Sequence, residues 1–356
     1  TWTTPLMRWA KAQGAITGYA HSANGLQIDP VAASKRMLAD LDKNGDRELS
    51  PAEAKAGLLP EPFEKIDANG DGLLSLAELE AAHRRAATRL PNLAIPELNG
   101  IGAQEIFVTT SQGLCDFISA MDTARIPEWN CWYHIMNCGF PLKVSGETDF
   151  PCISGSRVGQ GRVYVQLGKV DRVEFADWAI GLARGHSYVS DGYAHALAFA
   201  VDGKSAGETL ELAKGGMVKV SAKVAFAAQM PLGTSVGAGL PTGPRHVELI
   251  VNGNVVATKD VPADDRVHDI DFSVPIERSS WVALRHFPQM HTNPVTVRVA
   301  GQPIRASRES ALWCAGCIEQ LWRARSNAIR ADEREAAHAK FLEAIDVYRK
   351  IAAEAR

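Results

Sequence analysis

The spacing of apolar positions predicts different structures for successive parts of the chain. From about residue 196, short runs rich in Val and Ile are separated by turn signals such as Asn252-Gly253, a pattern typical of a small antiparallel sandwich. The predicted strands are 196–201, 217–226, 246–256, 268–274, 281–286 and 295–299. From Ser307 to Ala355, apolar residues recur at helical spacing and predict two helices at the C-terminal end.

The first part of the chain alternates predicted strands and helices, which indicates an α/β layer architecture. The predicted strands are 14–20, 100–108, 143–149 and 162–167, and the predicted helices are 111–140 and 174–185. Residues 30–90 interrupt this alternation with helices and two polar loops. We therefore expect four parts, which are an α/β portion at 1–29 and 91–195, an all-α insert at 30–90, a β-sandwich at 196–305 and helices at 306–356.

Two loops in the insert have the residue order of a calcium-binding EF-hand loop. The second loop spans residues 67–78 and reads DANGDGLLSLAE. Gly72 stands at position 6, where the chain turns sharply and needs a left-handed backbone angle. The expected oxygen ligands are the side chains of Asp67, Asn69, Asp71, Ser75 and Glu78 and the backbone carbonyl of Leu73.

The first loop spans residues 42–53 and reads DKNGDRELSPAE. Arg47 replaces the glycine at position 6, and a left-handed turn at a non-glycine residue costs about 1 kcal/mol more. The expected ligands are the side chains of Asp42, Asn44, Asp46, Ser50 and Glu53 and the backbone carbonyl of Glu48. Both loops therefore predict Ca²⁺ as a cofactor. The alternative interpretation is an acidic surface turn rich in Asn and Gly.

The residues around the loops support a paired arrangement. Leu49 and Leu74 occupy position 8 of their loops, where paired EF-hands form a short strand contact. Pro60 and Pro62 lie in the linker between the loops and require short helices there. This compressed spacing is similar to that of dockerin repeats, which bind partner domains, but the internal position of the pair argues against a dockerin.

Length, charge and cysteine content exclude several functional classes. A chain of 356 residues predicts two to three domains. A net charge of −3 provides no basic surface for nucleic acid, and no apolar run approaches the roughly 20 residues of a membrane span. Six cysteines are too few for a disulfide-built scaffold, and Cys314 and Cys317 are expected to pack in a core. The compartment stays open, with an extracytoplasmic location as one option. The chain begins at Thr1, so we expect a fragment whose targeting signal lies upstream.

Polar residues at the ends of predicted strands suggest a second site. His21, Glu105 and Asp149 follow or end such strands, and His134 lies in the helix before the last of them. Ligands of open α/β folds gather at the carboxyl ends of strands, and His with carboxylate is a ligand set for Zn²⁺ or Mn²⁺. A metal-bound hydroxide at such a site would hydrolyse a small-molecule substrate. The alternative is that these residues cap helices or form hydrogen bonds in the core.

Several segments together resemble a known enzyme family. RWAKAQGAITGYAHS, WYHIMNCGFPLKVSGETDFPC, GSRVGQGRVYVQL, RGHSYVSDG and RSSWVALRHFPQMHTNPVTVRV are similar, in order, to the CehA/McbA-like branch of the PHP (polymerase and histidinol phosphatase) metallohydrolases. The resemblance implies a distorted α/β barrel and metal-dependent hydrolysis of phosphoesters, carbamates, esters or amides. It also implies that His21 and Asp149 are metal ligands. His134 or Glu105 is expected to bind the metal as well or to orient one of its ligands.

The chain departs from the pattern of this family in two places. It lacks the His-x-His pair of the first strand, and Phe150 and Pro151 follow Asp149 where the family has Asp-x-His. The resemblance covers the second half of such a protein, so an upstream half of the same protein is the expected partner. Two functions result. The first is a calcium-binding part of a PHP-type hydrolase, and the second is a non-catalytic calcium-binding interaction protein on a degenerate hydrolase scaffold.

Overall fold

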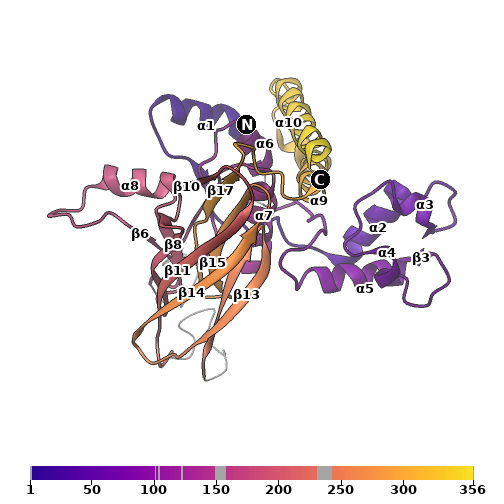
Figure 1. Cartoon of the computed structure of the whole chain (residues 1–356). Coiled ribbons are helices and arrows are strands. Elements are labelled where there is room, and N and C mark those ends of the chain that lie inside the picture. Colours follow the sequence, from indigo (N-terminus) through magenta and orange to yellow (C-terminus); the bar gives the residue numbers. More distant parts are fainter. Residues whose placement is uncertain are drawn as a thin grey trace.

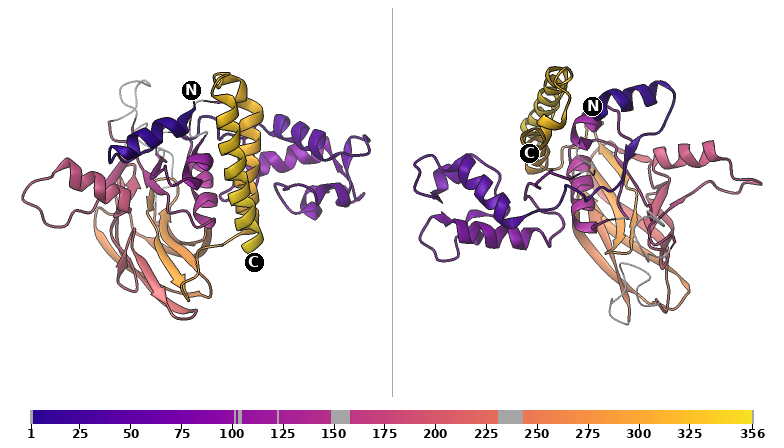
Figure 2. Two further views of the ribbon diagram at one scale, coloured as in Figure 1. Left: turned by 90° about the horizontal axis from the view of Figure 1, so that it is seen from above. Right: turned by 180° about the vertical axis from the view of Figure 1, so that it is seen from behind.

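The computed structural model describes residues 2–100, 102, 105–121, 123–148, 158–230 and 243–355. Figure 1 shows a small α/β layer, a large β-sandwich below it, two long C-terminal helices above it, and a helical module that protrudes to one side. The two further views in Figure 2 show the same separation of the module from the sandwich. The predicted mixed α/β architecture, the sandwich and the C-terminal helices are therefore confirmed.

The α/β layer is built on a three-stranded parallel sheet. Its strands are β1 (Gly18–Tyr19), β4 (Phe117–Ser119) and β5 (Lys143–Ser145), with β4 in the middle. The helices of this layer are α1 (Thr3–Ala12), α6 (Ile106–Ser111) and α7 (Arg125–Asn137). In the part of the chain that the structure describes, these strands form an open sheet and no closed barrel. The strand predicted at 143–149 is a strand only to Ser145, and Asp149 lies outside the described residues.

Two predictions for the α/β layer are wrong. The expected strand at 100–108 is helical from Ile106, because the apolar run continues as α6 and buries Ile106, Phe107 and Val108 on one core. The expected helix at 111–140 is interrupted by strand β4, and α7 begins only at Arg125. Pro127 lies in the first turn of α7, where a missing backbone N–H costs no helical hydrogen bond.

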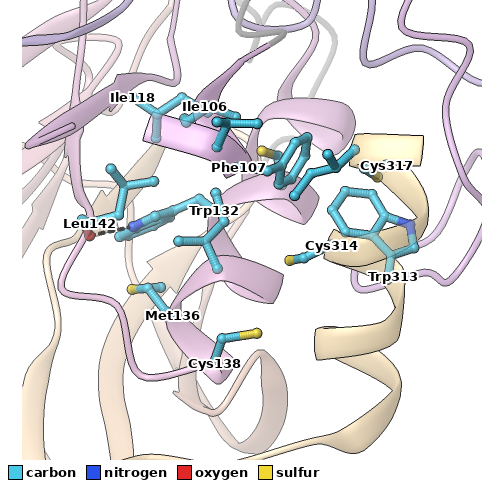
Figure 3. Packing of buried hydrophobic residues seen from close by; sticks show 14 of the residues in the cluster. Ile106, Phe107, Ile118, Trp132, Met136, Cys138, Leu142, Trp313, Cys314 and Cys317 are labelled. Atoms are coloured by element: carbon cyan, nitrogen blue, oxygen red, sulfur yellow. Dashed lines mark hydrogen bonds between the residues drawn. The ribbon is translucent and has the colours of Figure 1, made fainter. Parts of the chain in front are cut away.

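Helix α7 is the centre of the molecule and is buried on all sides. Trp129, Trp132 and Tyr133 are fully buried, and the Trp132 indole N–H donates to the carbonyl of Leu142 at 2.8 Å. On the opposite side, α7 packs against helix α9, which contributes Trp313, Cys314 and Cys317 to the same core (Figure 3). The expectation that these two cysteines pack in a core is confirmed, and their thiols are completely buried.

The β-sandwich consists of two sheets packed around a core of Val, Ile, Leu and Phe side chains. The larger sheet contains β6 (Arg162–Val165), β7 (Ser187–Ser190), β10 (Thr209–Leu212), β12 (Arg245–Val251), β13 (Asn254–Val261), β15 (Ser280–His286), β16 (Met290–Thr292) and β17 (Val295–Val299). The smaller sheet contains β8 (Ala194–Val201), β9 (Lys204–Ser205), β11 (Gly216–Phe226) and β14 (Val267–Ile276). Pairing is antiparallel throughout except between β10 and β17.

The middle of the larger sheet, strands β15 and β16, is buried on both faces and connects the sandwich to the α/β layer. Every residue of β15 is buried, and the Trp281 indole N–H donates to the Asn137 side-chain oxygen of α7 at 2.8 Å. The predicted strand 246–256 proves to be a hairpin. Asn252 and Gly253 have φ of 51° and 87°, so this pair forms the two-residue turn between β12 and β13.

The remaining helices complete the body. Helix α8 (Phe175–Arg184) ends at Gly185 with φ of 76°, close to the predicted range of 174–185. The predicted C-terminal pair is α9 (Arg308–Arg325) and α10 (Arg334–Glu354), joined through the short 3₁₀ helix η1 (Ser326–Ala328). Among the described residues, no helix combines the length and the apolar character that a membrane span requires.

The helical module that protrudes to one side is formed by residues 30–86. It contains helices α2 (Pro30–Leu41), α3 (Pro51–Ala54), α4 (Phe63–Ile66) and α5 (Leu76–Ala86) and strands β2 (Glu48–Leu49) and β3 (Leu74–Ser75). Helices α3 and α4 have four residues each, as expected for the linker with Pro60 and Pro62. Leu49, Ile66, Leu74, Leu79 and Ala82 form a separate small core inside the module.

Candidate metal sites

The two predicted calcium loops adopt the same backbone arrangement. In the first loop, Asp42 accepts hydrogen bonds from the backbone N–H groups of Gly45 at 2.7 Å and Arg47 at 2.9 Å. In the second loop, Asp67 accepts the equivalent two bonds at 2.8 and 3.0 Å. The residue at position 1 therefore closes each loop in the same way, although the two sequences differ at position 6.

Position 6 is left-handed in both loops. Gly72 has φ of 82° and Arg47 has φ of 70°. The loop geometry therefore imposes the left-handed angle even where the side chain opposes it, at a cost of about 1 kcal/mol at Arg47. This strain in the first loop is the physical reason to expect weaker ion binding there.

The glutamates at position 12 are held in matching positions. Glu53 accepts from the backbone N–H of Lys43 at 2.9 Å and from the Ser50 hydroxyl at 2.7 Å. Glu78 accepts the equivalent bonds from the second residue of its loop at 2.9 Å and from the Ser75 hydroxyl at 2.7 Å. Each serine also caps the next helix in a reciprocal capping box, so positions 9 and 12 of each loop are fixed together.

These hydrogen bonds keep both carboxylates ionised. The Ser50 hydroxyl, helped by nearby backbone N–H groups, lowers the pKa of Glu53 to about 2. Partial burial would raise the pKa of Glu78, but hydrogen bonds from Ser75, Ala68 and Asn69 outweigh it and lower the pKa below its usual value. Both glutamates are therefore anionic near neutral pH, which is the state that a calcium ligand requires.

The loops are joined through strands β2 and β3, as predicted from position 8. Leu49 pairs with Leu74, and Glu48 pairs with Ser75, in an antiparallel contact of two residues on each strand. Both leucines are completely buried. Because the last ligand positions of each loop follow this contact directly, the position of one loop is coupled to that of the other.

The available donors fit a hard cation. Each loop offers carboxylate, amide, hydroxyl and backbone carbonyl oxygens and no sulfur or imidazole, which is the donor set of a Ca²⁺ site. Across the described residues, no group of three or more His, Cys, Asp and Glu side chains lies in a metal-holding arrangement. In this structure the carboxylates at positions 1, 5 and 12 of each loop accept hydrogen bonds from backbone N–H groups instead.

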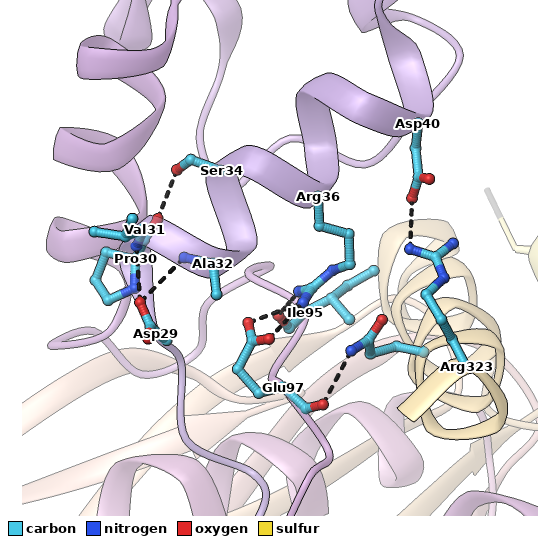
Figure 4. Close-up of polar contacts among 11 residues, drawn as sticks. Asp29, Pro30, Val31, Ala32, Ser34, Arg36, Asp40, Ile95, Glu97 and Arg323 are labelled. Carbon is cyan, nitrogen blue, oxygen red and sulfur yellow. Dashed lines mark hydrogen bonds and ion pairs between the residues drawn. The ribbon is translucent and has the colours of Figure 1, made fainter. Parts of the chain in front are cut away.

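Helix α2, which leads into the first loop, is fastened to the body of the protein (Figure 4). Arg36 donates two hydrogen bonds to the Glu97 carboxylate at 2.9 and 2.8 Å and one to the Ile95 carbonyl at 2.8 Å. Asp40 accepts from Arg323 of α9 at 3.0 Å. Asp40 precedes the first loop by two residues, so the fixed helix also fixes the start of that loop.

The predicted hydrolase residues do not assemble into one site within the described part of the chain. His21 follows β1 with φ of 51°, and Asp149 lies outside the described residues. Glu105 precedes α6 and accepts from the backbone N–H of Thr3 at 2.9 Å, and burial raises the pKa of its carboxyl. The structure thus gives Glu105 a hydrogen bond to helix α1, while its proposed catalytic role stays a prediction.

His134 is held inside the core by two hydrogen bonds. Its Nε2 donates to the Asn92 carbonyl at 2.7 Å, and its Nδ1 accepts from the Ser310 hydroxyl at 2.9 Å. The ring also stacks on Trp313 with a centroid distance of 4.3 Å. These contacts account for the buried imidazole without a metal ion, and the catalytic role of His134 stays a prediction.

A second buried histidine belongs to a network that the sequence did not reveal. The Tyr133 hydroxyl donates to His291 Nε2 at 2.6 Å, and Arg285 donates to the same hydroxyl at 3.2 Å and to Glu248 at 2.5 Å. His291 Nδ1 donates to the carbonyl of Thr292 at 2.7 Å. The members of this network come from α7, β12, β15 and β16, so no local sequence signal could have identified it.

The two buried histidines should make the protein sensitive to mild acid. Burial lowers the pKa of His134 to about 4 and that of His291 to about 3. Both values lie below about 6.5 for an unfolded histidine, so the unfolded chain binds more protons between pH 6.5 and 4. The stabilising contribution of the two neutral rings is therefore fully present above pH 6.5. Below pH 6.5, the free energy of unfolding falls by about 1.4 kcal/mol per pH unit for each histidine, until the pH reaches the pKa of the folded state. Urea unfolding at pH 7 and pH 5 measures this loss.

A matched pair of variants isolates the contribution of one ring. His134→Gln keeps a donor and an acceptor but cannot titrate, so it should reduce the difference between pH 7 and pH 5. His338 is exposed, and His338→Gln should leave that difference as in the parent protein. An equal pH dependence in the parent and in His134→Gln would show that the buried ring does not control acid stability.

The chain was compared with known families, curated proteins and solved structures. No family model matches it, and no curated protein matches it significantly. A solved structure of the sulfur carrier protein SoxY from Chlorobium limicola f thiosulfatophilum is similar over 29% of this chain and 79% of its own, with 17% identity and a TM-score of 0.18. Such a TM-score does not establish a shared fold, so function has to be argued from the residues themselves.

Proposed function

We propose that this is a calcium-binding protein in which residues 42–53 and 67–78 form a pair of EF-hands, each holding one Ca²⁺ ion. The observation that carries the proposal is the equivalence of the two loops. Positions 1, 6, 9 and 12 have the same conformation and hydrogen bonds in both, and the loops pair at position 8. An acidic surface turn has no reason to repeat this arrangement at such spacing.

The EF-hand pair acts as a stabilising module rather than as a sensor that opens. The linker helices have only four residues each, which leaves little helix to move. Helix α2 is also tied to the body through Arg36 and Asp40. Calcium would therefore hold the loops of a module that is already docked.

Native mass spectrometry tests the proposal directly by counting bound ions. Protein exchanged into calcium-containing volatile buffer should carry two Ca²⁺ ions per chain, and protein treated with a chelator should carry none. Protein that carries no Ca²⁺ after exchange into the calcium buffer would rule out the proposed function.

A second candidate function is metal-dependent hydrolysis by a PHP-type enzyme of which this chain is a part. The observation that favours it is the parallel order of β1, β4 and β5, because the carboxyl ends of parallel strands lie at one edge. His21 follows β1 and Asp149 follows β5 in sequence, and these two would hold Zn²⁺ or Mn²⁺. His134 and Glu105 would orient neighbouring groups, and an upstream half would supply the missing ligands. The alternative is a non-catalytic interaction protein on the same scaffold.

This candidate predicts that residues 1–356 alone have no measurable hydrolase activity. A site with only two or three ligands loses much of its metal affinity, because the His-x-His pair is absent from the chain. The assay would use Zn²⁺ or Mn²⁺ with aryl esters and phosphoesters, beside the His21→Ala and Asp149→Ala variants. Clear turnover by the parent chain that both variants abolish would show that the chain already holds a complete site.

A further inference from the structure

A cavity of about 400 Å³ lies where the protruding helical module, residues 30–86, joins the rest of the protein. Its walls come from Leu26–Ile28 before α2, from Ala87 at the end of α5, and from Ala124–Pro127 at the start of α7. Phe287 and Trp313 add two aromatic side chains from the sandwich and from α9. The cavity is in the size range of small-molecule sites, and junctions between structural units are common places for such sites.

The position of this cavity relative to the parallel sheet supports a binding role. The segment 26–28 follows the carboxyl end of β1, and the segment 124–127 follows the carboxyl end of β4. Open α/β sheets bind their ligands outside the carboxyl ends of the strands, where the connecting loops separate and leave space. Two of the segments that line the cavity are therefore connections that leave the carboxyl ends of these strands, where a ligand is expected on topological grounds.

The lining residues define the chemistry of the ligand. Leu26, Ile28, Ile126 and the two aromatic rings give an apolar wall. The charged residue in the wall is Arg125, and its buried guanidinium is balanced by the Glu128 carboxylate at 3.7 Å.

The amide groups in the wall are largely committed to each other. The Asn92 backbone N–H donates to the Asn130 side-chain oxygen at 2.7 Å, and the Asn130 amide donates to the Asn92 carbonyl at 3.1 Å. A charged ligand would find no opposite charge that is not already compensated. An uncharged ligand with a flat ring fits this wall best.

We propose that this cavity is a binding site for an uncharged aromatic small molecule. The ring would lie among Phe287, Trp313 and the isoleucines, and the exposed Gln27 at the rim would fix its orientation. A cavity of about 150 Å³ is sufficient for benzene, so a two-ring compound fits the larger volume here. The proposal does not require hydrolase activity, and it does not depend on calcium occupancy.

Ligand-observed saturation-transfer NMR with 1-naphthol, an uncharged two-ring probe, tests the site on the full chain. The parent protein should transfer saturation to the probe. The double variant Ala87→Leu with Ala124→Leu fills the cavity from two walls and should weaken binding at least tenfold. Ala306→Leu fills a separate cavity of about 450 Å³ near the start of α9 and should bind the probe as the parent does.

Two outcomes would overturn the proposal. One is the absence of saturation transfer to 1-naphthol in the folded parent protein. The other is equal transfer in the parent and in the filled variant, which would place the probe elsewhere. Circular dichroism of the filled variant confirms that it is folded. If it is not folded, Phe287→Ala serves instead, because Phe287 lies at the rim with 36% of its surface exposed and its removal takes away one ring contact.

Discussion

Calorimetric titration with Ca²⁺ should show two binding sites per chain, and the Glu78→Gln variant should lose the tighter one. Glu78 is expected to bind the ion with both oxygens, and glutamine supplies one uncharged oxygen in its place. We expect at least a tenfold loss of affinity at that site, which corresponds to about 1.4 kcal/mol. Glu53→Gln should have the same effect on the weaker site.

Position 6 explains why the second loop should be tighter and offers a gain-of-function test. Arg47→Gly removes the strain of a left-handed non-glycine residue, so it should increase the affinity of the first loop by up to about tenfold. Glu64 is exposed and lies outside both loops, which makes Glu64→Gln the matched charge control. If Glu78→Gln leaves the calcium stoichiometry and both affinities unchanged, the second loop is not a calcium site.

Calcium should raise the unfolding temperature of the module without exposing a new apolar surface. At a free Ca²⁺ concentration of 100 times Kd, each site adds about 2.7 kcal/mol to the free energy of unfolding. The two sites would together add about 5 kcal/mol, which exceeds the expected effect of one acid-sensitive histidine over one pH unit. Calorimetric scans with calcium and with a chelator measure this stabilisation.

The contacts that hold α2 to the body explain why calcium should expose no new apolar surface. Because Arg36 ties α2 to Glu97 and Ile95, the module cannot open in the way that sensor EF-hands do. Binding of a hydrophobic dye to the folded protein should therefore change little on addition of calcium. A large increase in dye fluorescence would contradict the account of a closed, stabilising module.

The sequence predicted those parts of the fold that depend on local patterns. Alternating Val and Ile positions identified most strands of the sandwich, and Asn252-Gly253 marked the turn that splits one predicted strand into β12 and β13. The first half of α6, Ile106–Val108, was wrongly assigned to a strand, because a short apolar run can form a buried strand or a buried helix equally well. In the structure this segment is helical and packs against α9 and α10.

The candidate sites also differ in how far they depend on local sequence patterns. An EF-hand loop is one continuous segment, so each ligand position could be assigned from the sequence before the structure was known. The strand-end residues needed distant segments to come together, and the structure instead places His134 in the core with Asn92 and Ser310. The cavity beside the module was not predictable, because its walls come from segments between Leu26 and Trp313 that show no common motif.

A crystal structure of the chain grown with calcium is the most direct test of the central claim. It should show one ion in each of the loops 42–53 and 67–78, with six to eight oxygen ligands at about 2.3–2.6 Å. Asp67, Asn69, Asp71, the Leu73 carbonyl and both oxygens of Glu78 should surround the ion in the second loop. Loops that keep their hydrogen bonds between carboxylate and backbone, with no ion bound at millimolar calcium, would contradict it.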